Sequence, residues 1–350
     1  MRRRMFIQAT TAAVLGSTLP PGGRAAGSAG HNHRCAADEF VWKQMMMPPN
    51  HILRLNGHTD TVPDIVGRIG APIGLAIFTE GNHFPVLLGG EIVEPFRTWA
   101  HGDSRYAGLD LENIVIVTLP QPMIVAMVRG QGIGLGNLTL EVSRRSGFYP
   151  DVVMGGLAPL TELHQAGVVD AEAQVFARNR GLSLLVRAGN RLAIHHLEDL
   201  KRPDVRIIMA SADEPGARSQ YISALKAMLG GEATESILVR ETGMFPGRLG
   251  IQHRDVLHAL AAREAEVGII FHHLARYFAD AYPQVCAMVT VPGAEQFFAT
   301  IAMVSAIDPL RARAGKAFTE YFLSVARTVY PRYGFVSMTD AEYGAPLTLR

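Results

Sequence analysis

From residue 72 onward, short apolar runs alternate with longer stretches whose apolar positions recur at helical spacing. Apolar runs bounded by turn residues predict buried strands, and amphipathic stretches predict helices. Alternation of the two along the chain is typical of an α/β protein. The predicted strands are residues 73–78, 113–119, 151–155, 181–188, 205–210, 267–271 and 286–292, and the predicted helices are 85–99, 121–129, 158–166, 217–229, 253–264, 272–281 and 310–329.

Four of the predicted strands end in a polar loop that leads straight into a helix. The loops read TEGNHF, LPQP, SADEPGAR and, after the strand at 267–271, the histidine pair HH. In open α/β sheets, ligands bind beyond the carboxyl ends of the strands, where helix N-termini present N–H groups and the positive end of a dipole. The pattern therefore predicts a site suited to an anion.

A glycine-rich segment, RGQGIGLGN at 129–137, invites comparison with a dinucleotide-binding loop. That fingerprint needs GxGxxG directly after a strand and at the start of a helix. Here the glycines alternate, follow a predicted helix and run into the strand-like NLTLEV. Alternating glycines of this kind indicate a tight turn and close backbone approach instead.

The N-terminus has the features of an export signal. Residues 1–30 combine a basic start, an uncharged core and a Pro/Gly/Ala-rich stretch, and Arg3-Arg4-Met5-Phe6-Ile7 is similar to a twin-arginine signature. The core is far shorter than the roughly 20 residues that a membrane span needs. We expect an exported periplasmic protein beginning near His31, with an extended N-terminal arm over 31–71. Two cysteines, Cys35 and Cys286, predict no structural disulfide.

Composition limits the classes of partner that we expect for this protein. The chain has 33 basic and 32 acidic residues, a net charge of +1, and no basic block beyond the signal. It therefore lacks the electrostatic footprint of a nucleic-acid-binding protein, and we expect a small-molecule or ion ligand and a monomer. A mature chain of this length, 48% hydrophobic, exceeds what one core usually organises, which predicts two lobes.

Four segments carry a resemblance to a known family: YPDVVMGGLAPLTELHQAGVV at 149–169, VFARNRGLSLLVRAGN at 175–190, HLEDLKRPDVRIIMASADEPGARSQYISALKAM at 196–228 and VLHALAAREAEVGIIFHH at 256–273. In their order and spacing the chain resembles the periplasmic solute-binding proteins of molybdate-type ABC transporters.

The resemblance implies the two-lobed type II periplasmic-binding-protein fold, with mixed sheets flanked by helices and a ligand cleft between the lobes. Lobe one would comprise 72–180 plus 284–350, and lobe two 181–283. It also implies an ABC permease as partner and an oxyanion such as molybdate or tungstate as ligand, with no cofactor and no resident metal.

The chain differs from this family at the oxyanion-binding positions. Small hydroxyl residues are usual there, but this chain has Thr79-Glu80-Gly81-Asn82-His83 and Thr118-Leu119-Pro120-Gln121. The family's tyrosine after the strand at 267–270 is replaced by Phe271, followed by His272 and His273.

The candidate ligand-binding residues lie at the strand ends and helix starts. Thr79 and Asn82 have an alternative role as turn or cap residues, and Arg218 has one as an ion-pair partner of Glu214. Consecutive residues of a helix point about 100° apart, so we expect one histidine of the pair, His272, to face the cleft. The full set is Thr79, Asn82, His83, Thr118, Gln121, Ser211, Arg218, His253, Arg254 and His272.

No catalytic or metal-site motif is present in the sequence, so we expect a binding protein and not an enzyme. Two alternatives remain open. The same fold could bind a transition-metal ion or metal complex through Glu80, His83, His253 and His272. A non-transport role as an exported sensor partner or cofactor chaperone is the other.

Overall fold

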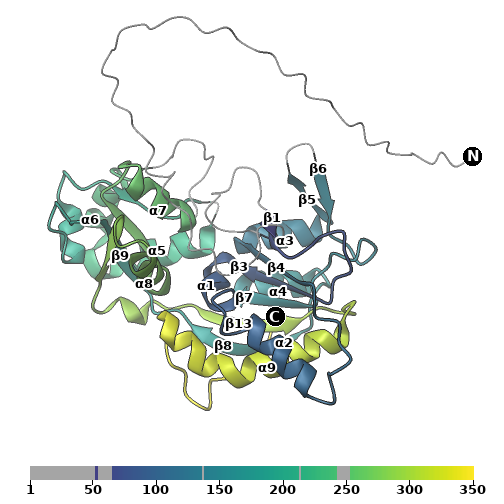
Figure 1. The fold of residues 1–350 in the computed structure, drawn as a ribbon. Helices are drawn as coiled ribbons and strands as arrows, with labels where there is room; N and C mark the ends of the chain where they lie inside the picture. Colours follow the sequence, from purple (N-terminus) through teal and green to yellow (C-terminus); the bar gives the residue numbers. More distant parts are fainter. Residues whose placement is uncertain (1–51, 54–64, 136–137, 213, 243–252) are drawn as a thin grey trace, which may run out of the picture. The chain divides into compact units, whose positions relative to one another are not determined.

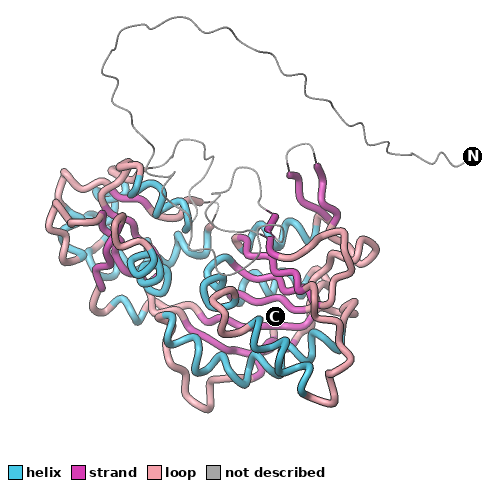
Figure 2. The backbone as a smooth tube through the Cα atoms, viewed as in Figure 1, coloured by secondary structure: helices cyan, strands magenta, loops and turns pink. Residues whose placement is uncertain are grey.

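The computed structural model describes residues 52–53, 65–135, 138–212, 214–242 and 253–350 (Figure 1). Within them the chain forms an eight-stranded sheet, a four-stranded sheet and a two-stranded hairpin (Figure 2). The predicted mixed α/β fold is confirmed. None of the helices in these ranges is long and apolar enough to cross a membrane. The predicted export signal and Cys35 lie outside the described residues.

The eight-stranded sheet is mixed. Its central strand β3 runs parallel to both neighbours, β4 and β7, whereas β13 is antiparallel to β7 and β8. The predicted strands at 73–78, 113–119 and 151–155 correspond to β3, β4 and β7. In order across the sheet the strands are β1 (Ile52–Leu53), β2 (Ile65–Val66), β4 (Ile114–Leu119), β3 (Leu75–Glu80), β7 (Val152–Gly156), β13 (Thr300–Ser305), β8 (Glu172–Arg178) and β14 (Pro346–Thr348).

Helices cover both faces of this sheet. Side chains alternate along β3, so Phe78 joins one core with residues of α3 (Gln121–Arg129) and α4 (Leu157–Gln165). Ile77 joins the core formed with α1 (Phe84–Leu87), α2 (Val93–Gly102) and α9 (Ala312–Val329). Because both faces are buried, the central strands read as continuous apolar runs.

The four-stranded sheet has the order β10 (Ile207–Ile208), β11 (Val267–Phe271), β9 (Leu182–Arg187), β12 (Cys286–Thr290). The helices of this part of the chain are α5 (Pro215–Leu229), α6 (Gly231–Leu238), α7 (His253–Ala261) and α8 (His272–Ala281). β12 pairs with β9, although it lies beyond the predicted boundary at 283. The division into lobes at that residue remains a prediction. Short 3-10 helices are η3 (Gly81–His83), η4 (Leu197–Lys201), η5 (Ala294–Gln296) and η6 (Tyr330–Tyr333).

Two chain segments, 179–181 and 291–299, connect the two larger sheets. They are bonded to each other, because the N–H of Ala299 donates to Oδ1 of Asn179 (2.8 Å) and the N–H of Asn179 donates to the carbonyl of Ala299 (3.1 Å). Gly181 has φ +73°, and a Cβ there would lie 1.9 Å from the carbonyl oxygen of Ala294. This close approach requires glycine at the crossing.

Two of the alternating glycines, Gly132 and Gly134, lie in a strand of a hairpin. β5 (Gly132–Leu135) pairs antiparallel with β6 (Leu138–Glu141). The expected close backbone approach is thus the pairing of two short strands. The next described element after β5 is a strand, whereas the dinucleotide fingerprint needs a helix.

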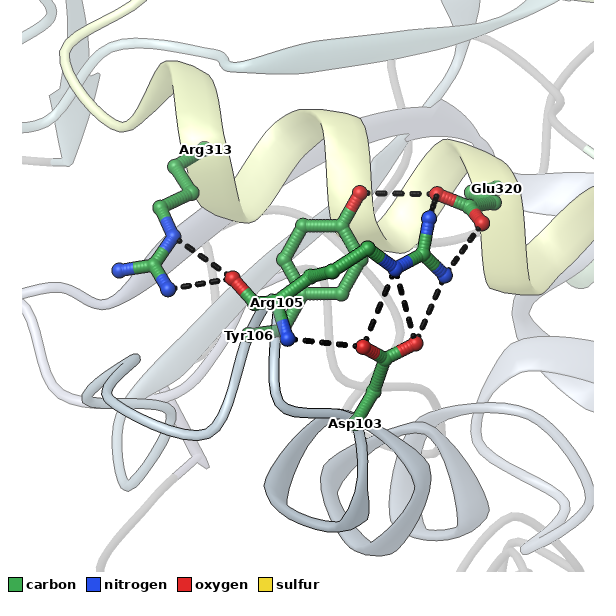
Figure 3. Close-up of polar contacts among 5 residues, drawn as sticks. All are labelled: Asp103, Arg105, Tyr106, Arg313 and Glu320. Carbon is green, nitrogen blue, oxygen red and sulfur yellow. Dashed lines mark hydrogen bonds and ion pairs between the residues drawn. The ribbon is translucent and has the colours of Figure 1, made fainter.

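Two charge networks fix the large helix α9 against its surroundings. At its start, Arg311 bonds the fully buried carboxylate of Asp151 (2.5 Å), which also accepts from the N–H of Ala76 (2.8 Å). Further along, Figure 3 shows Arg105 between Asp103 (2.7 Å) and Glu320 (2.7 Å). The hydrogen bonds from Arg105 lower the pKa of Asp103. The second network is exposed, so it contributes less than the buried pair.

Candidate functional site

A cavity of about 570 Å³ lies where the helices of the two sheets begin. Its wall includes the first residues of α3, α4, α5 and α7, together with the residues around the end of β3 and the end of β11. The cavity therefore draws on both sheets. It matches the location expected from the polar strand ends.

The N-cap positions of three of these helices carry no capping side-chain hydrogen bond. They are Pro120 for α3, Gly156 for α4 and Glu214 for α5. Pro and Gly have no polar side chain to offer, so the sequence itself leaves the first-turn N–H groups of α3 and α4 without that partner. Pro122 and Pro215 remove one donor each from α3 and α5. The positive helix ends still favour an anion in the cavity.

Gln121 is a predicted site residue and lines the cavity. Its Oε1 accepts from the N–H of Gly156 at 2.9 Å, which ties α3 to the start of α4. A Cβ on Gly155 would lie 1.6 Å from Nε2 of Gln121. The Gly155-Gly156 pair therefore makes the space that this side chain occupies.

Arg254, in the first turn of α7, is a predicted site residue that also lines the cavity. Its Nη2 donates to the main-chain carbonyl of Thr118 at 3.1 Å and so reaches from one sheet's helices to the other sheet. Thr118 thus takes part through its backbone oxygen. Its side chain is fully buried in β4 and is not part of the cavity wall, contrary to the expectation of a hydroxyl donor there.

His253 lines the cavity as predicted and is held at both ring nitrogens. Nδ1 lies 2.5 Å from Oε2 of Glu214, and Nε2 lies 2.7 Å from the hydroxyl of Tyr221. That hydroxyl also accepts from the N–H of Phe271 (2.9 Å). The carboxylate of Glu214 and the hydroxyl of Tyr221 therefore fix the orientation of the His253 ring.

The end of β3 places Glu80 and Asn82 in the cavity wall. The amide of Asn82 donates to Oε1 of Glu80 at 3.3 Å, and Nε2 of His83 lies 3.3 Å from the same oxygen. His83 itself is fully buried outside the cavity, with Nδ1 3.2 Å from the hydroxyl of Tyr330 and its ring stacked on Phe335. His83 therefore contacts Glu80 from the protein core and does not line the cavity. Thr79 is also buried, and its hydroxyl donates to the carbonyl of Glu80.

The histidine pair does not reach the cavity. The expectation that His272 faces it is not met, because Nδ1 of His272 bonds the hydroxyl of Ser183 on β9 at 2.9 Å. Burial lowers the pKa of His272 to about 4. His273 lies between the rings of Phe335 (4.1 Å) and Phe271 (5.7 Å). Phe271 lines the cavity at the end of β11, whereas His272 is held by Ser183 and His273 by the rings of Phe271 and Phe335.

Ser211 and Arg218, also predicted, lie outside the cavity wall. Arg218 forms an ion pair, as its alternative role predicted, but the partner is Glu241 and not Glu214. Its guanidinium contacts both carboxylate oxygens of Glu241 (2.6 and 2.8 Å) and the carbonyl of Ala210 (3.0 Å). It ties α5 to the segment that follows α6.

Three uncharged polar residues outside the predicted set line the cavity: Asn179, Gln220 and Thr300. Asn179 belongs to one crossing between the sheets, Thr300 begins β13 where the other crossing ends, and Nε2 of Gln220 donates to the carbonyl of Phe297 at 2.5 Å. The sequence signal for Asn179 is an Asn two residues before the glycine that begins the predicted strand 181–188. Among the described residues, no group of three or more His, Cys, Asp or Glu side chains is arranged to hold a metal ion.

Comparisons with known proteins agree with this arrangement. The chain resembles, in structure, the sulfate-binding protein SubI from Mycobacterium tuberculosis, with 15% identity, 77% of this chain and 88% of that chain covered, and a TM-score of 0.55. A substrate-binding protein of an ABC transporter from Agrobacterium tumefaciens gives 10% identity, 80% and 86% coverage, and a TM-score of 0.54. PEB3 with L-phospholactate bound gives 12% identity, 75% and 100% coverage, and a TM-score of 0.51. These likenesses concern the fold.

No curated protein compared by sequence matches the chain. The family model described as bacterial extracellular solute-binding protein matches residues 128–336, which is more than half of the chain. That span includes the starts of α4, α5 and α7 at the cavity and both crossings between the sheets. The chain therefore belongs to the bacterial extracellular solute-binding protein family.

Proposed function

We propose that this chain is the periplasmic solute-binding component of an ABC importer and that its cavity holds the solute through an oxyanion group. The family consists of solute-binding proteins of transporters, not of enzymes. The observation that carries the oxyanion proposal is the gathering of four helix starts, those of α3, α4, α5 and α7, with Arg254 around one cavity. Molybdate and tungstate are the members of this ligand class that the family resemblance implies.

The proposal rests on fixed positive charge in the cavity wall, which complements an anion without any rearrangement of the protein. First-turn N–H groups and helix dipoles supply fixed partial positive charge, and a guanidinium can bind two oxygens of one anion at once. Arg254 bonds the far wall at Thr118, so a ligand at this point would contact groups from both sheets. Such a ligand stabilises the closed arrangement of two lobes joined by hinge segments.

The metal-ion alternative gains less support. Of the four residues it requires, Glu80 and His253 line the cavity, whereas His83 and His272 are buried elsewhere. Both ring nitrogens of His253 already face protein partners. The hydroxyl-based oxyanion site expected from the family does not form either, since the side chains of Thr118 and Ser211 are not in the cavity wall.

A thermal-shift panel tests the proposal. Molybdate, tungstate, sulfate, phosphate and small organic carboxylates, phosphates and sulfonates are compared with ferric and divalent metal ions. A selective ligand at a hundredfold excess over its dissociation constant should stabilise the protein by about 2.7 kcal/mol. Replacing Arg254 with Gln should remove the shift given by the anions.

Arg276→Gln is the matched control, because Arg276 is exposed on α8 outside the cavity wall and its ion-pair partner among the described residues is Asp280 at 3.8 Å. It should leave the anion-dependent shift unchanged. A shift produced by metal ions alone would reject the oxyanion proposal. Equal anion-dependent shifts in wild type and in the Arg254→Gln protein would show that Arg254 does not bind the anion.

A further inference from the structure

We infer that the solute is a small organic molecule that carries a cationic, donor-rich group such as an ammonium in addition to its oxyanion group. This inference rests on the proposed function, since it concerns the remainder of the same solute. Its basis is that the cavity wall contains carboxylates for which an oxyanion offers no partner.

The two carboxylates come from opposite parts of the fold. Glu80 ends β3 in the eight-stranded sheet, and Glu214 precedes α5 beside the four-stranded sheet. Their side chains are 17% and 10% exposed, so both are largely removed from bulk water. Burial raises the pKa of Tyr221, and both carboxylates add to that effect. Both carboxylates line the same cavity.

In the described part of the chain, no Arg or Lys forms an ion pair with either carboxylate. Glu80 contacts the amide of Asn82 and the imidazole of His83, and Glu214 contacts Nδ1 of His253. A third carboxylate of the wall, Glu162, differs because Arg129 pairs with it at 2.5 Å.

A bare oxyanion in this cavity would meet repulsion. Like charges repel more strongly where little water screens them. Arg254 is the one Arg or Lys among the described wall residues, against the two carboxylates of Glu80 and Glu214. A solute with one anionic and one cationic end satisfies both kinds of group, with the oxyanion at Arg254 and the helix starts and the cation at the carboxylates.

The rest of the wall fits a carbon body. Phe84, Phe271, Leu274 and Phe278 line the cavity beside the polar groups. The volume of about 570 Å³ lies within the range of roughly 300–1,000 Å³ typical of sites for organic ligands. Apolar walls with a few convergent polar groups are the usual form of such sites.

Matched pairs of probes test the inference. Each pair shares an anionic group and differs in an ammonium: O-phosphoethanolamine and ethyl phosphate, taurine and ethanesulfonate, β-alanine and propionate. Isothermal titration and thermal shift are measured on the mature chain. In at least one pair the ammonium-bearing member should bind tighter by about tenfold or more, the size of a charge-assisted hydrogen bond.

Variants that each remove one carboxylate test whether Glu80 and Glu214 cause the preference for the ammonium group. Glu80→Gln and Glu214→Gln, made separately because Glu214 also supports His253, should each bring the two members of the responsive pair toward equal affinity. Glu94→Gln, which alters an exposed carboxylate that pairs with Arg97 on α2 outside the cavity wall, should leave the preference intact.

Two outcomes overturn the inference. One is that no pair shows tighter binding of its ammonium-bearing member, and the other is tight binding of molybdate, sulfate or phosphate by the wild-type cavity. In the last case the proposed oxyanion function stands and the amphoteric solute is rejected. Response to metal ions alone rejects both.

Discussion

The buried histidine pair makes the stability of this protein depend on pH in a calculable way. His273 is packed between Phe271 and Phe335, and neither of its ring nitrogens has a hydrogen-bond partner among the residues that the structure describes. Burial holds the pKa of His273 well below its ordinary value, and the neighbouring histidines His83, His253 and His272 add to that effect. Burial also lowers the pKa of His272 to about 4.

The sign follows from proton binding in the two states. Above pH 6.5 both histidines are neutral whether the chain is folded or unfolded, and they add no pH dependence. Below pH 6.5 the two histidines bind protons in the unfolded chain but stay unprotonated in the folded chain, so the free energy of unfolding falls as the pH falls. The slope approaches about 1.4 kcal/mol per pH unit for each histidine. For His272 this loss ends near pH 4, where the folded protein takes up its proton.

Between pH 7.5 and pH 5 each histidine should therefore remove about 2 kcal/mol from the free energy of unfolding, and the pair about 4 kcal/mol. Replacing His273 with Phe keeps an aromatic ring in the stack and removes one proton-binding group. The variant should lose about 2 kcal/mol less than wild type over the same range. It should also be as stable as wild type or more stable at pH 7.5, because buried unpaired nitrogens cost about 1–3 kcal/mol.

Urea unfolding followed by circular dichroism at pH 7.5, 6.5, 5.5 and 5.0 measures these differences. His101→Gln is the control, because His101 is exposed at the end of α2. It should retain the acid loss of wild type. A His273→Phe protein with the same pH dependence as wild type would refute the assignment of His273 as a buried neutral group.

Three further predictions concern the scaffold. Gly181→Ala should lower the free energy of unfolding by about 3 kcal/mol or more, because the added Cβ would meet the Ala294 carbonyl. Gly189→Ala, at φ +77° with open space around it, should lower it by about 1–2 kcal/mol. Equal losses of the two variants in thermal unfolding would contradict the close approach at Gly181. Arg311→Ala should cost about 3–5 kcal/mol because it strands the buried Asp151 carboxylate, against about 1 kcal/mol or less for Arg327→Ala at an exposed pair with Asp340, as read from urea midpoints. In a Cys35→Ser protein, Cys286 should react with Ellman's reagent only after unfolding, since burial raises the pKa of its thiol to about 12, and prompt labelling of the native chain would show that it is accessible.

Local pattern was sufficient for much of the secondary structure. The predicted strand at 267–271 and the predicted helices at 121–129 and 272–281 have the observed bounds. β8 and β13 were missed, because EAQVFAR carries charged ends and TIAMVS lies between two loops, so neither forms a clear apolar run. Their place is fixed by pairing with each other and by β7 on the far side of β13.

The candidate site was predicted in part. Asn82 and Gln121 line the cavity because each lies at a helix start directly after a strand, and His253 and Arg254 line it from the start of α7. Thr79 and Thr118 lie within the ends of buried strands, where the pleat directs side chains into the cores.

The sequence by itself determined that apolar strands alternate with amphipathic helices and that polar loops lie at the strand ends. It also carried the family resemblance and a near-neutral net charge, which gives no indication of a nucleic-acid partner. Only the tertiary structure decided which polar groups meet. Periodicity records whether a residue is buried, but the contact from Arg254 to the Thr118 carbonyl joins residues far apart in the chain and depends on how the sheets are arranged. The same holds for His272 and His273, because a helix start specifies their divergence and the surrounding packing decides which face each one meets.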